Sequence, residues 1–162
     1  MRSMKTQDTL NLEVQGSGSV YLHDSEFSAL TVVLGGSGDV DVSAISVGRR
    51  GANIAGSGAI QVGTLKAGST MVSIGGAGDF SIGDDCLIKG DVTVNIAGSG
   101  DFNGESCRAD ATVANIIGSG DVRIGESSRI NANIVGSGSV YYRTADNTSA
   151  SILGSGELER ID

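Results

Sequence analysis

Apolar and polar residues alternate on both sides of a Gly-x-Gly triplet that recurs from one end of the chain to the other. The residue two places before the first glycine is apolar in every repeat, and so is the residue two places after the second. Alternation with a period of two is typical of a short β-strand with one buried face. Each triplet is therefore expected to form a corner between two short strands.

The triplets begin at intervals of 20, 20, 20, 22, 20, 18 and 18 residues, which indicates a repeat protein. A tight bend needs either a positive φ or a close approach of the backbone, and glycine allows both. We assign a structural corner role to both glycines of every triplet. These are Gly16, Gly18, Gly36, Gly38, Gly56, Gly58, Gly76, Gly78, Gly98, Gly100, Gly118, Gly120, Gly136, Gly138, Gly154 and Gly156.

Two architectures fit a strand, a corner and a second strand. An antiparallel meander would use each triplet as a hairpin turn, whereas a solenoid would stack each corner on the previous one. We favour the solenoid because it gives equivalent positions of all repeats the same surroundings. The prediction is an all-β fold, a single right-handed parallel β-helix (β-solenoid) with coils of about 20 residues and seven to eight rungs. Residues 10–162 are assigned to this domain, and residues 1–9 to an N-terminal tail or a lead-in to the first strand.

The position three residues before the first corner glycine faces outward by the same alternation. Most repeats place an amide or a hydroxyl side chain there, and stacked coils would align these side chains in an amide and hydroxyl ladder. The column reads Glu13, Val33, Asn53, Ser73, Asn95, Asn115, Asn133 and Ser151.

The position directly before the first glycine also alternates outward, and it becomes more apolar toward the C-terminus. On the outside of a solenoid, Ile117, Val135 and Leu153 would form an exposed apolar strip and a candidate oligomer interface. Alternatively, the corner turns this position into the core. The strand edges at the two ends of a solenoid are a second candidate route to self-association.

Composition narrows the range of partners. The formal net charge is −8, with 11 Lys and Arg against 19 Asp and Glu, which argues against nucleic acid and against attachment to anionic lipid. No apolar run approaches the length of a membrane-spanning helix, so we expect no direct membrane insertion. The first residues lack the apolar run of a secretory signal, so the chain alone leaves a cytoplasmic location open.

Asp79, Asp101 and Asp121 follow the corner in three consecutive repeats. Stacked carboxylates repel one another, which would favour a bound cation such as Ca²⁺. Other residues, among them Ser19 and Ser139, occupy the same position in other repeats. We therefore interpret the aspartates as turn-forming residues and assign no metal or cofactor, with calcium binding by this acidic ladder as a secondary hypothesis.

No catalytic constellation is recognisable in the chain. Paired carboxylates on a β-helix resemble those of a glycosidase, but the chain has a single histidine, His23, no tryptophan, and three residues each of Phe and Tyr to stack on sugar rings. The glycine triplets are not followed by the Gly-Lys-Ser/Thr of a phosphate-binding loop. We assign no catalytic residue and predict that the protein is not an enzyme.

Cys86 and Cys107 lie eight and seven residues after their corners in adjacent repeats. Two cysteines without neighbouring histidines do not make a zinc site. Side-by-side positions on parallel strands are often unsuitable for a disulfide. We interpret the two residues as buried free thiols that act as small core side chains, with a disulfide as the alternative.

The segments NIAGSGDF at residues 95–102 and IIGSGDV at residues 116–122 resemble the repeat of the bacterial head GIN domain, the auto-transporter adhesin family. The resemblance extends from about Leu10 to the C-terminus. It implies a right-handed β-helix in the periplasm or at the cell surface, and it supplies no catalytic residues.

The leading hypothesis is accordingly a non-catalytic surface or envelope module for adhesion, recognition or structural spacing, with a surface glycan or an envelope protein as partner. One alternative is a self-assembling scaffold, a homo-oligomer built through the solenoid ends or the apolar strip. The other is a carbohydrate- or cation-binding β-helix.

Overall fold

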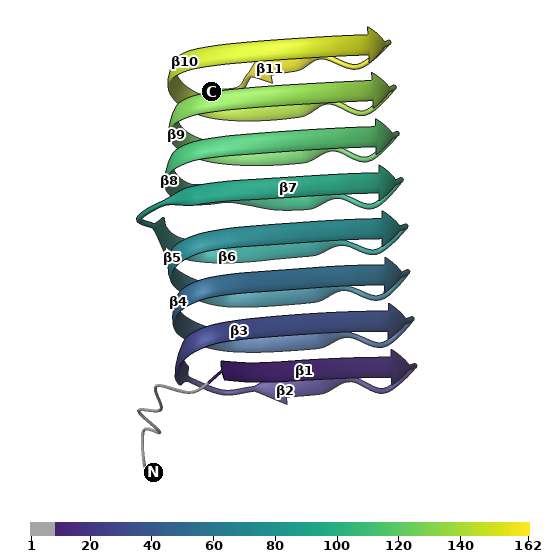
Figure 1. The fold of residues 1–162 in the computed structure, drawn as a ribbon, viewed down its shortest axis with the longest axis vertical. Coiled ribbons are helices and arrows are strands. Elements are labelled where there is room, and N and C mark those ends of the chain that lie inside the picture. Colours follow the sequence, from purple (N-terminus) through teal and green to yellow (C-terminus); the bar gives the residue numbers. More distant parts are fainter. Residues whose placement is uncertain (1–8) are drawn as a thin grey trace.

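The computed structural model describes residues 9–162, which form one stack of coils (Figure 1). All of its strand pairs are parallel and belong to one sheet of 11 strands, which winds upward as a right-handed β-solenoid. The predicted fold class is confirmed, and the antiparallel meander is wrong. Of the predicted N-terminal tail, residues 1–8 lie outside the described residues, and Thr9 begins the first strand. The strands are β1 (Thr9–Gly16), β2 (Val20–Leu22), β3 (Ser25–Gly36), β4 (Val40–Gly56), β5 (Ile60–Gly76), β6 (Phe80–Ile88), β7 (Asp91–Gly98), β8 (Phe102–Gly118), β9 (Val122–Gly136), β10 (Val140–Gly154) and β11 (Leu158–Arg160).

Equivalent residues of successive coils lie directly over one another. In the column two places before the corner, Ile54 pairs with Ile74, which pairs in turn with Ile96. The column continues through Ile116 to Ile134, and its members from Leu34 to Ile134 are at most 2% exposed. The repeat in the sequence is therefore a repeat of columns in space, with each apolar column forming a continuous spine of the core.

The core is a single filled interior that runs the length of the stack. Within β4, Val40, Val42, Ile45, Val47 and Ile54 all face inward and are at most 5% exposed. Val, Ile and Leu fill most of the inward positions because β-branched and aliphatic side chains pack well on a pleated surface. Two phenylalanines occupy the same inward column in adjacent coils, and the rings of Phe80 and Phe102 stack with their centres 5.6 Å apart. A small space beside Phe102 and Ile124 in this interior has a volume of about 10 Å³, too little for a ligand, so we place candidate sites on the outer surface.

The coil of 22 residues absorbs its two extra residues locally. One produces the register shift between Val62 and Thr64 where β5 pairs with β6. The other lies between β6 and β7, at Lys89 and Gly90, where the chain bulges from the stack (Figure 1). Both insertions precede β7, and the inward columns are back in register in that strand.

The corner glycines serve two different purposes. The first glycine of every triplet has a positive φ, between 94° and 158°, which L-residues with side chains rarely adopt. The second glycine is required by crowding, because a Cβ there would overlap the carbonyl oxygen of the equivalent glycine one coil below, as between Gly38 and Gly18. Gly18 itself, in the first coil, has open space at this position. The corner role predicted for these glycines is thus explained by the geometry of stacking.

A glycine-to-alanine pair tests this explanation. A Cβ at Gly100 would overlap the carbonyl oxygen of Gly78 and lie 2.7 Å from Cγ2 of Ile74, so Gly100→Ala should lower the free energy of unfolding by about 3 kcal/mol. Gly75→Ala is the control, because its Cβ would meet only the carbonyl oxygen of Ile54 at 3.8 Å. Urea unfolding measures both variants, and equal stabilities would contradict the stacking argument.

Candidate functional surfaces

The aspartate ladder is part of the corner structure. One carboxylate oxygen of each aspartate accepts a hydrogen bond from the backbone N–H of the equivalent residue in the next coil. Asp79 accepts from Asp101 at 3.0 Å, Asp101 from Asp121 at 2.8 Å, and Asp121 from Ser139 at 2.8 Å. Among residues 9–162, no group of three or more His, Cys, Asp or Glu side chains is placed to hold a metal ion. The carboxylates therefore satisfy backbone donors of the coil above, which is a structural role between coils rather than within the turn, and calcium binding stays an untested hypothesis.

A second ladder runs along the outer side of the strands that precede the corners. The amide of Asn115 donates to Oδ1 of Asn95, and the amide of Asn133 donates to Oδ1 of Asn115, both at 2.8 Å. The outward stacked column predicted from the alternation is confirmed, and in it each of these amides bonds to the same group one coil away. These side chains hold neighbouring coils in register and leave the surface without charge.

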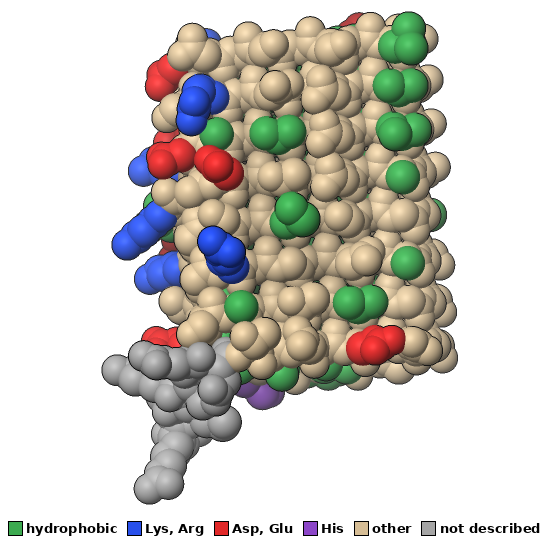
Figure 2. Space-filling view, in the orientation of Figure 1, with side chains coloured by type: hydrophobic (Ala, Val, Ile, Leu, Met, Phe, Trp, Pro, Cys, Tyr) green, Lys and Arg blue, Asp and Glu red, His purple; other side chains and the backbone are tan. Residues whose placement is uncertain are grey.

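We define the broad face as the outward positions one, three and five residues before the first glycine of each triplet. Glu13 is the one charged residue in these three columns, although the chain carries 30 charged residues in all. Figure 2 shows this face as a flat surface of mainly neutral polar atoms, with charged side chains gathered along one edge. Interface centres are depleted of charged residues, so a flat, nearly uncharged face on an acidic protein is a candidate contact surface.

The apolar strip forms the other edge of the broad face. Ile117 is 63% exposed, Val135 47% and Leu153 72%, and they pair in register on β8, β9 and β10. Figure 2 shows hydrophobic side chains in line over these coils. Of the two alternatives for this column, the exposed strip is correct and the inward turn is wrong. Its role as an oligomer interface stays a prediction.

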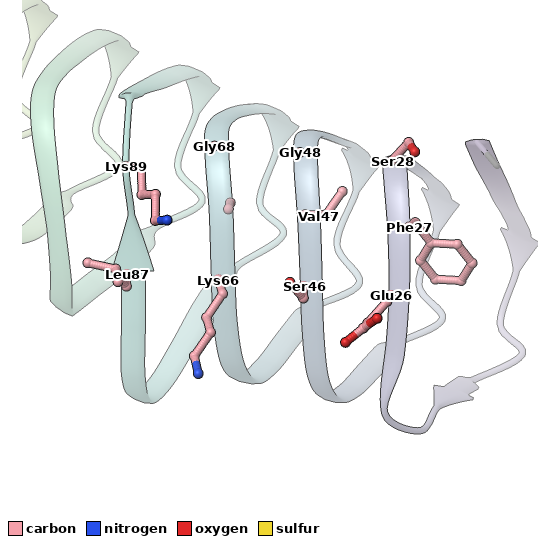
Figure 3. Close-up of a pocket in the computed structure, with 11 residues that line it drawn as sticks. Glu26, Phe27, Ser28, Ser46, Val47, Gly48, Lys66, Gly68, Leu87 and Lys89 are labelled. Atoms are coloured by element: carbon pink, nitrogen blue, oxygen red, sulfur yellow. The ribbon is translucent and has the colours of Figure 1, made fainter. Parts of the chain in front are cut away.

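The sequence did not point to a groove that crosses β3 to β6 on another side of the solenoid. The groove has a volume of about 630 Å³, and Glu26, Ser46, Lys66 and Leu87 lie along it from one coil to the next (Figure 3). Gly48 and Gly68 also line the groove, and a Cβ at either position would overlap a backbone carbonyl of the coil below. A signal for it was present, because these two glycines recur 20 residues apart outside the triplets.

Cys86 and Cys107 are joined by a disulfide between β6 and β8, so the interpretation as free thiols is wrong. Both residues are 5% exposed, and their Cα atoms are 4.5 Å apart. The register shift between Ser81 and Cys86 compensates for their unequal distances from the corner and brings the two cysteines opposite each other. The bond links two neighbouring coils covalently.

Residues 1–93 and 89–145 match the family model described as "Putative auto-transporter adhesin, head GIN domain". The chain belongs to the head GIN domain family. No curated protein is significantly similar to it in sequence. Among residues 9–162 there is no helical segment with the length and hydrophobicity that a bilayer crossing requires.

One solved structure shares the fold of this head GIN domain. It is described as a "Putative lipid binding protein" from Parabacteroides distasonis, with 26% sequence identity and a TM-score of 0.72. The match covers 95% of the present chain but 61% of that protein, so the chain spans less than two thirds of its structural relative.

One feature of this head GIN domain was not expected from its sequence. Arg50 occupies an inward column between Leu30 and Thr70 and is only 3% exposed. Its guanidinium carbon lies 4.8 Å from the centre of the Phe80 ring, and none of its three nitrogens has a hydrogen-bond partner among the described residues. Burial lowers the pKa of Arg50 to about 10. The domain thus keeps an unpaired cation in its core, with the face of an aromatic ring as its main partner.

The buried charge leads to a prediction on stability. Because burial depresses the pKa of Arg50, the cationic form destabilises the fold fully below about pH 10, and this cost declines as the pH rises further. Arg50→Leu, which copies Leu30 of the same column, should raise the free energy of unfolding by about 2 kcal/mol at pH 7. The gain should shrink above about pH 10. Arg49→Leu, at an exposed neighbouring position, is the matched control and should give no gain. The free energies of unfolding of the wild type and both variants are measured with urea at several pH values. A lower free energy of unfolding in Arg50→Leu than in the wild type would contradict the argument.

Removing the disulfide should weaken the stack. The bond closes a segment with a sequence separation of 21 residues, for which chain entropy suggests a stabilisation of about 3 kcal/mol. A Cys86→Ala/Cys107→Ala variant should lose about that amount. Dithiothreitol should lower the melting temperature of the wild type and leave that of the variant unchanged. Detection of two free thiols in the unreduced, denatured wild type would refute the bond.

Proposed function

We propose that this head GIN domain is a non-catalytic envelope or cell-surface module that recognises a glycan or a protein through its broad face. The observation that carries the proposal is the near absence of charge on that face in a chain of net charge −8, together with the apolar strip at its edge. A rigid sheet loses little conformational entropy on binding. A flat surface without charge is suited to a partner that is also uncharged. The family description as an adhesin supports the same function.

The polar side chains that form ladders along the solenoid make hydrogen bonds within the protein. The aspartate carboxylates accept backbone hydrogen bonds, and the asparagine amides bond to one another. What remains for interaction is outer surface, which favours recognition over catalysis.

The disulfide supports a location outside the cytoplasm. Stable disulfides form in oxidising compartments such as the periplasm and the cell surface, and are rare in the cytosol. Cys86 and Cys107 are buried in adjacent coils, which suits a structural bond.

A second candidate function is lipid binding. The groove combines the cations Lys66 and Lys89 with Leu87, which is 42% exposed, and Glu26 is the one acidic residue among the described residues that line it. Two cations beside an exposed apolar side chain suit an anionic headgroup with an attached chain. The solved relative is described as a lipid-binding protein. The groove and the broad face are formed by different residues, so the two functions can be separated by mutation.

The test compares two surfaces and two probes. Ile117→Thr/Val135→Thr/Leu153→Thr removes the apolar strip while keeping β-propensity, and should weaken binding to delipidated bacterial envelope at least about tenfold. Tyr21→Ser, which removes an exposed ring on β2 outside the broad face, is the control and should bind as the wild type does. Binding is measured by retention of the purified domain on the envelope fraction.

The second probe is a vesicle of phosphatidylethanolamine and phosphatidylglycerol. Binding to vesicles that Lys66→Glu/Lys89→Glu abolishes, without retention on delipidated envelope, would replace the broad-face proposal with lipid binding. Absence of binding to both probes would contradict both functions.

A further inference from the structure

The C-terminal end of the solenoid leaves core-facing residues uncovered. Ile152 is 40% exposed, whereas Ile134 directly below it in the same column is 1% exposed. Thr148 and Ala150, which also continue inward columns, are exposed as well. The last strand, β11, covers only Val140–Tyr142 of β10. Within residues 9–162, the backbone donors and acceptors on the upper edge of residues 147–154 therefore have no strand partner, and they lie above an open core.

The N-terminal end has a strand of matching length with a free lower edge. β1 comprises eight residues, Thr9–Gly16, and among the described residues it pairs only with β3 above it. β2, residues Val20–Leu22, likewise pairs only with β4. Residues 147–154 and 158–160 of the upper end present the same two lengths of strand, separated by the same corner.

We propose that a second copy of this chain stacks on the first head to tail. Its β1 pairs in parallel with residues 147–154 of β10, and its β2 pairs with β11. The inference goes beyond the proposed function, since it concerns the ends of the solenoid and not its broad face.

The corner hydrogen bonds of the stack continue across such a junction. Within the chain, the carbonyl of Gly16 accepts from the N–H groups of Ser37 at 2.9 Å and Gly38 at 3.1 Å, and the carbonyl of Gly136 accepts from Ser155 at 2.9 Å. The carbonyl of Gly154 holds the same place at the upper end and would accept from Ser17 and Gly18 of the second copy.

The side-chain ladder after the corner also continues. The carboxylate of Asp121 accepts from the N–H of Ser139, and the hydroxyl of Ser139 accepts from the N–H of Glu157 at 3.3 Å. Glu157 is next in this column, and its carboxylate would accept from the N–H of Ser19 of the second copy. The end residue thus has the acceptor that the following coil requires.

The inward-facing residues at the two ends of the solenoid match in apolar character. The junction would place Val14 over Ile152 and Leu12 over Ala150, which repeats the apolar character found between Ile134 and Ile116 inside the chain. Pairing of exposed edges between identical chains is a recognised route to self-association. Because the contact joins two different surfaces and does not close, it generates linear oligomers. The net charge of −8 opposes association at low ionic strength, so salt should promote it.

Gly18→Ala tests the junction without disturbing the single chain. A Cβ at Gly18 has nothing within 4 Å in one molecule, but in the oligomer it would overlap the carbonyl of Gly156, as a Cβ at Gly38 would overlap that of Gly18. Gly75→Ala, an outward mid-stack position, is the matched control. Sedimentation velocity on the 162-residue chain in 0.15 M salt should show that the average mass of the wild type and of Gly75→Ala rises with concentration. Gly18→Ala should remain monomeric. A wild type that stays monomeric at all concentrations, or a Gly18→Ala variant that associates equally, overturns the proposal.

A second variant blocks the other end. Ile152→Glu places a charge in the open core edge and should also prevent association. Each variant retains one intact end, so an equimolar mixture of Gly18→Ala and Ile152→Glu should form a dimer and nothing larger, with circular dichroism confirming that both are folded. Absence of that dimer overturns the head-to-tail arrangement, and larger species in the mixture would point to a different contact and overturn it as well.

Discussion

Each coil of the head GIN domain lies in parallel register on the coil before it, and this backbone ladder determines nearly every residue choice in the chain. Parallel strands are about 4.8 Å apart, so each side chain has the equivalent side chain of the next coil as its nearest neighbour. A column must therefore hold residue types whose side chains can pack against, or hydrogen-bond to, a side chain of the same type. Apolar side chains pack on one another in the core. On the outer surface amides hydrogen-bond to one another, as Asn95, Asn115 and Asn133 do in three consecutive coils. At the corner only glycine fits, because a Cβ would overlap the carbonyl below.

This constraint explains why the fold could be predicted from the sequence. The isoleucine column, the corner glycines and the asparagine ladder all repeat at the coil length, and one architecture gives all three the same surroundings in every coil. The outward direction of Ile117, Val135 and Leu153 also follows the alternation. Prediction succeeded where a position belongs to a column that the whole stack shares.

The features that were missed are departures from the columns. Cys86 and Cys107 differ by one residue in their distance from the corner, and only the local register shift in β6 brings them opposite each other. Arg50 stands in a column with Leu30, Thr70 and Val92, where no repeated residue type marks the position as inward. The groove is lined by Gly48 and Gly68, and their spacing of 20 residues does not by itself distinguish a groove from a bend of the coil. The two cysteines and Arg50 stand at single positions without a repeated signal, and the three-dimensional path of the chain determines where their side chains lie.

Stacking also bears on the charge pattern of the surface. Like charges in one column would repel at the strand spacing, so a long outward column is most stable when it is neutral or alternates in sign. The column of Asp79, Asp101 and Asp121 is an exception, in which each carboxylate accepts a backbone hydrogen bond from the next coil. The broad face takes the first solution, and the pair of Arg108 with Glu126, 2.9 Å apart on adjacent coils, illustrates the second. Neutral side chains on the broad face avoid repulsion between stacked coils. They also make the desolvation free energy small when the face binds a partner, because no charge is removed from water. The same property favours the end-to-end contact, since Glu13, the single charge on the broad face, would stack on the neutral Ser151 of the next molecule. Each added copy would then lengthen one continuous neutral surface, so that self-association and recognition depend on the same residue pattern.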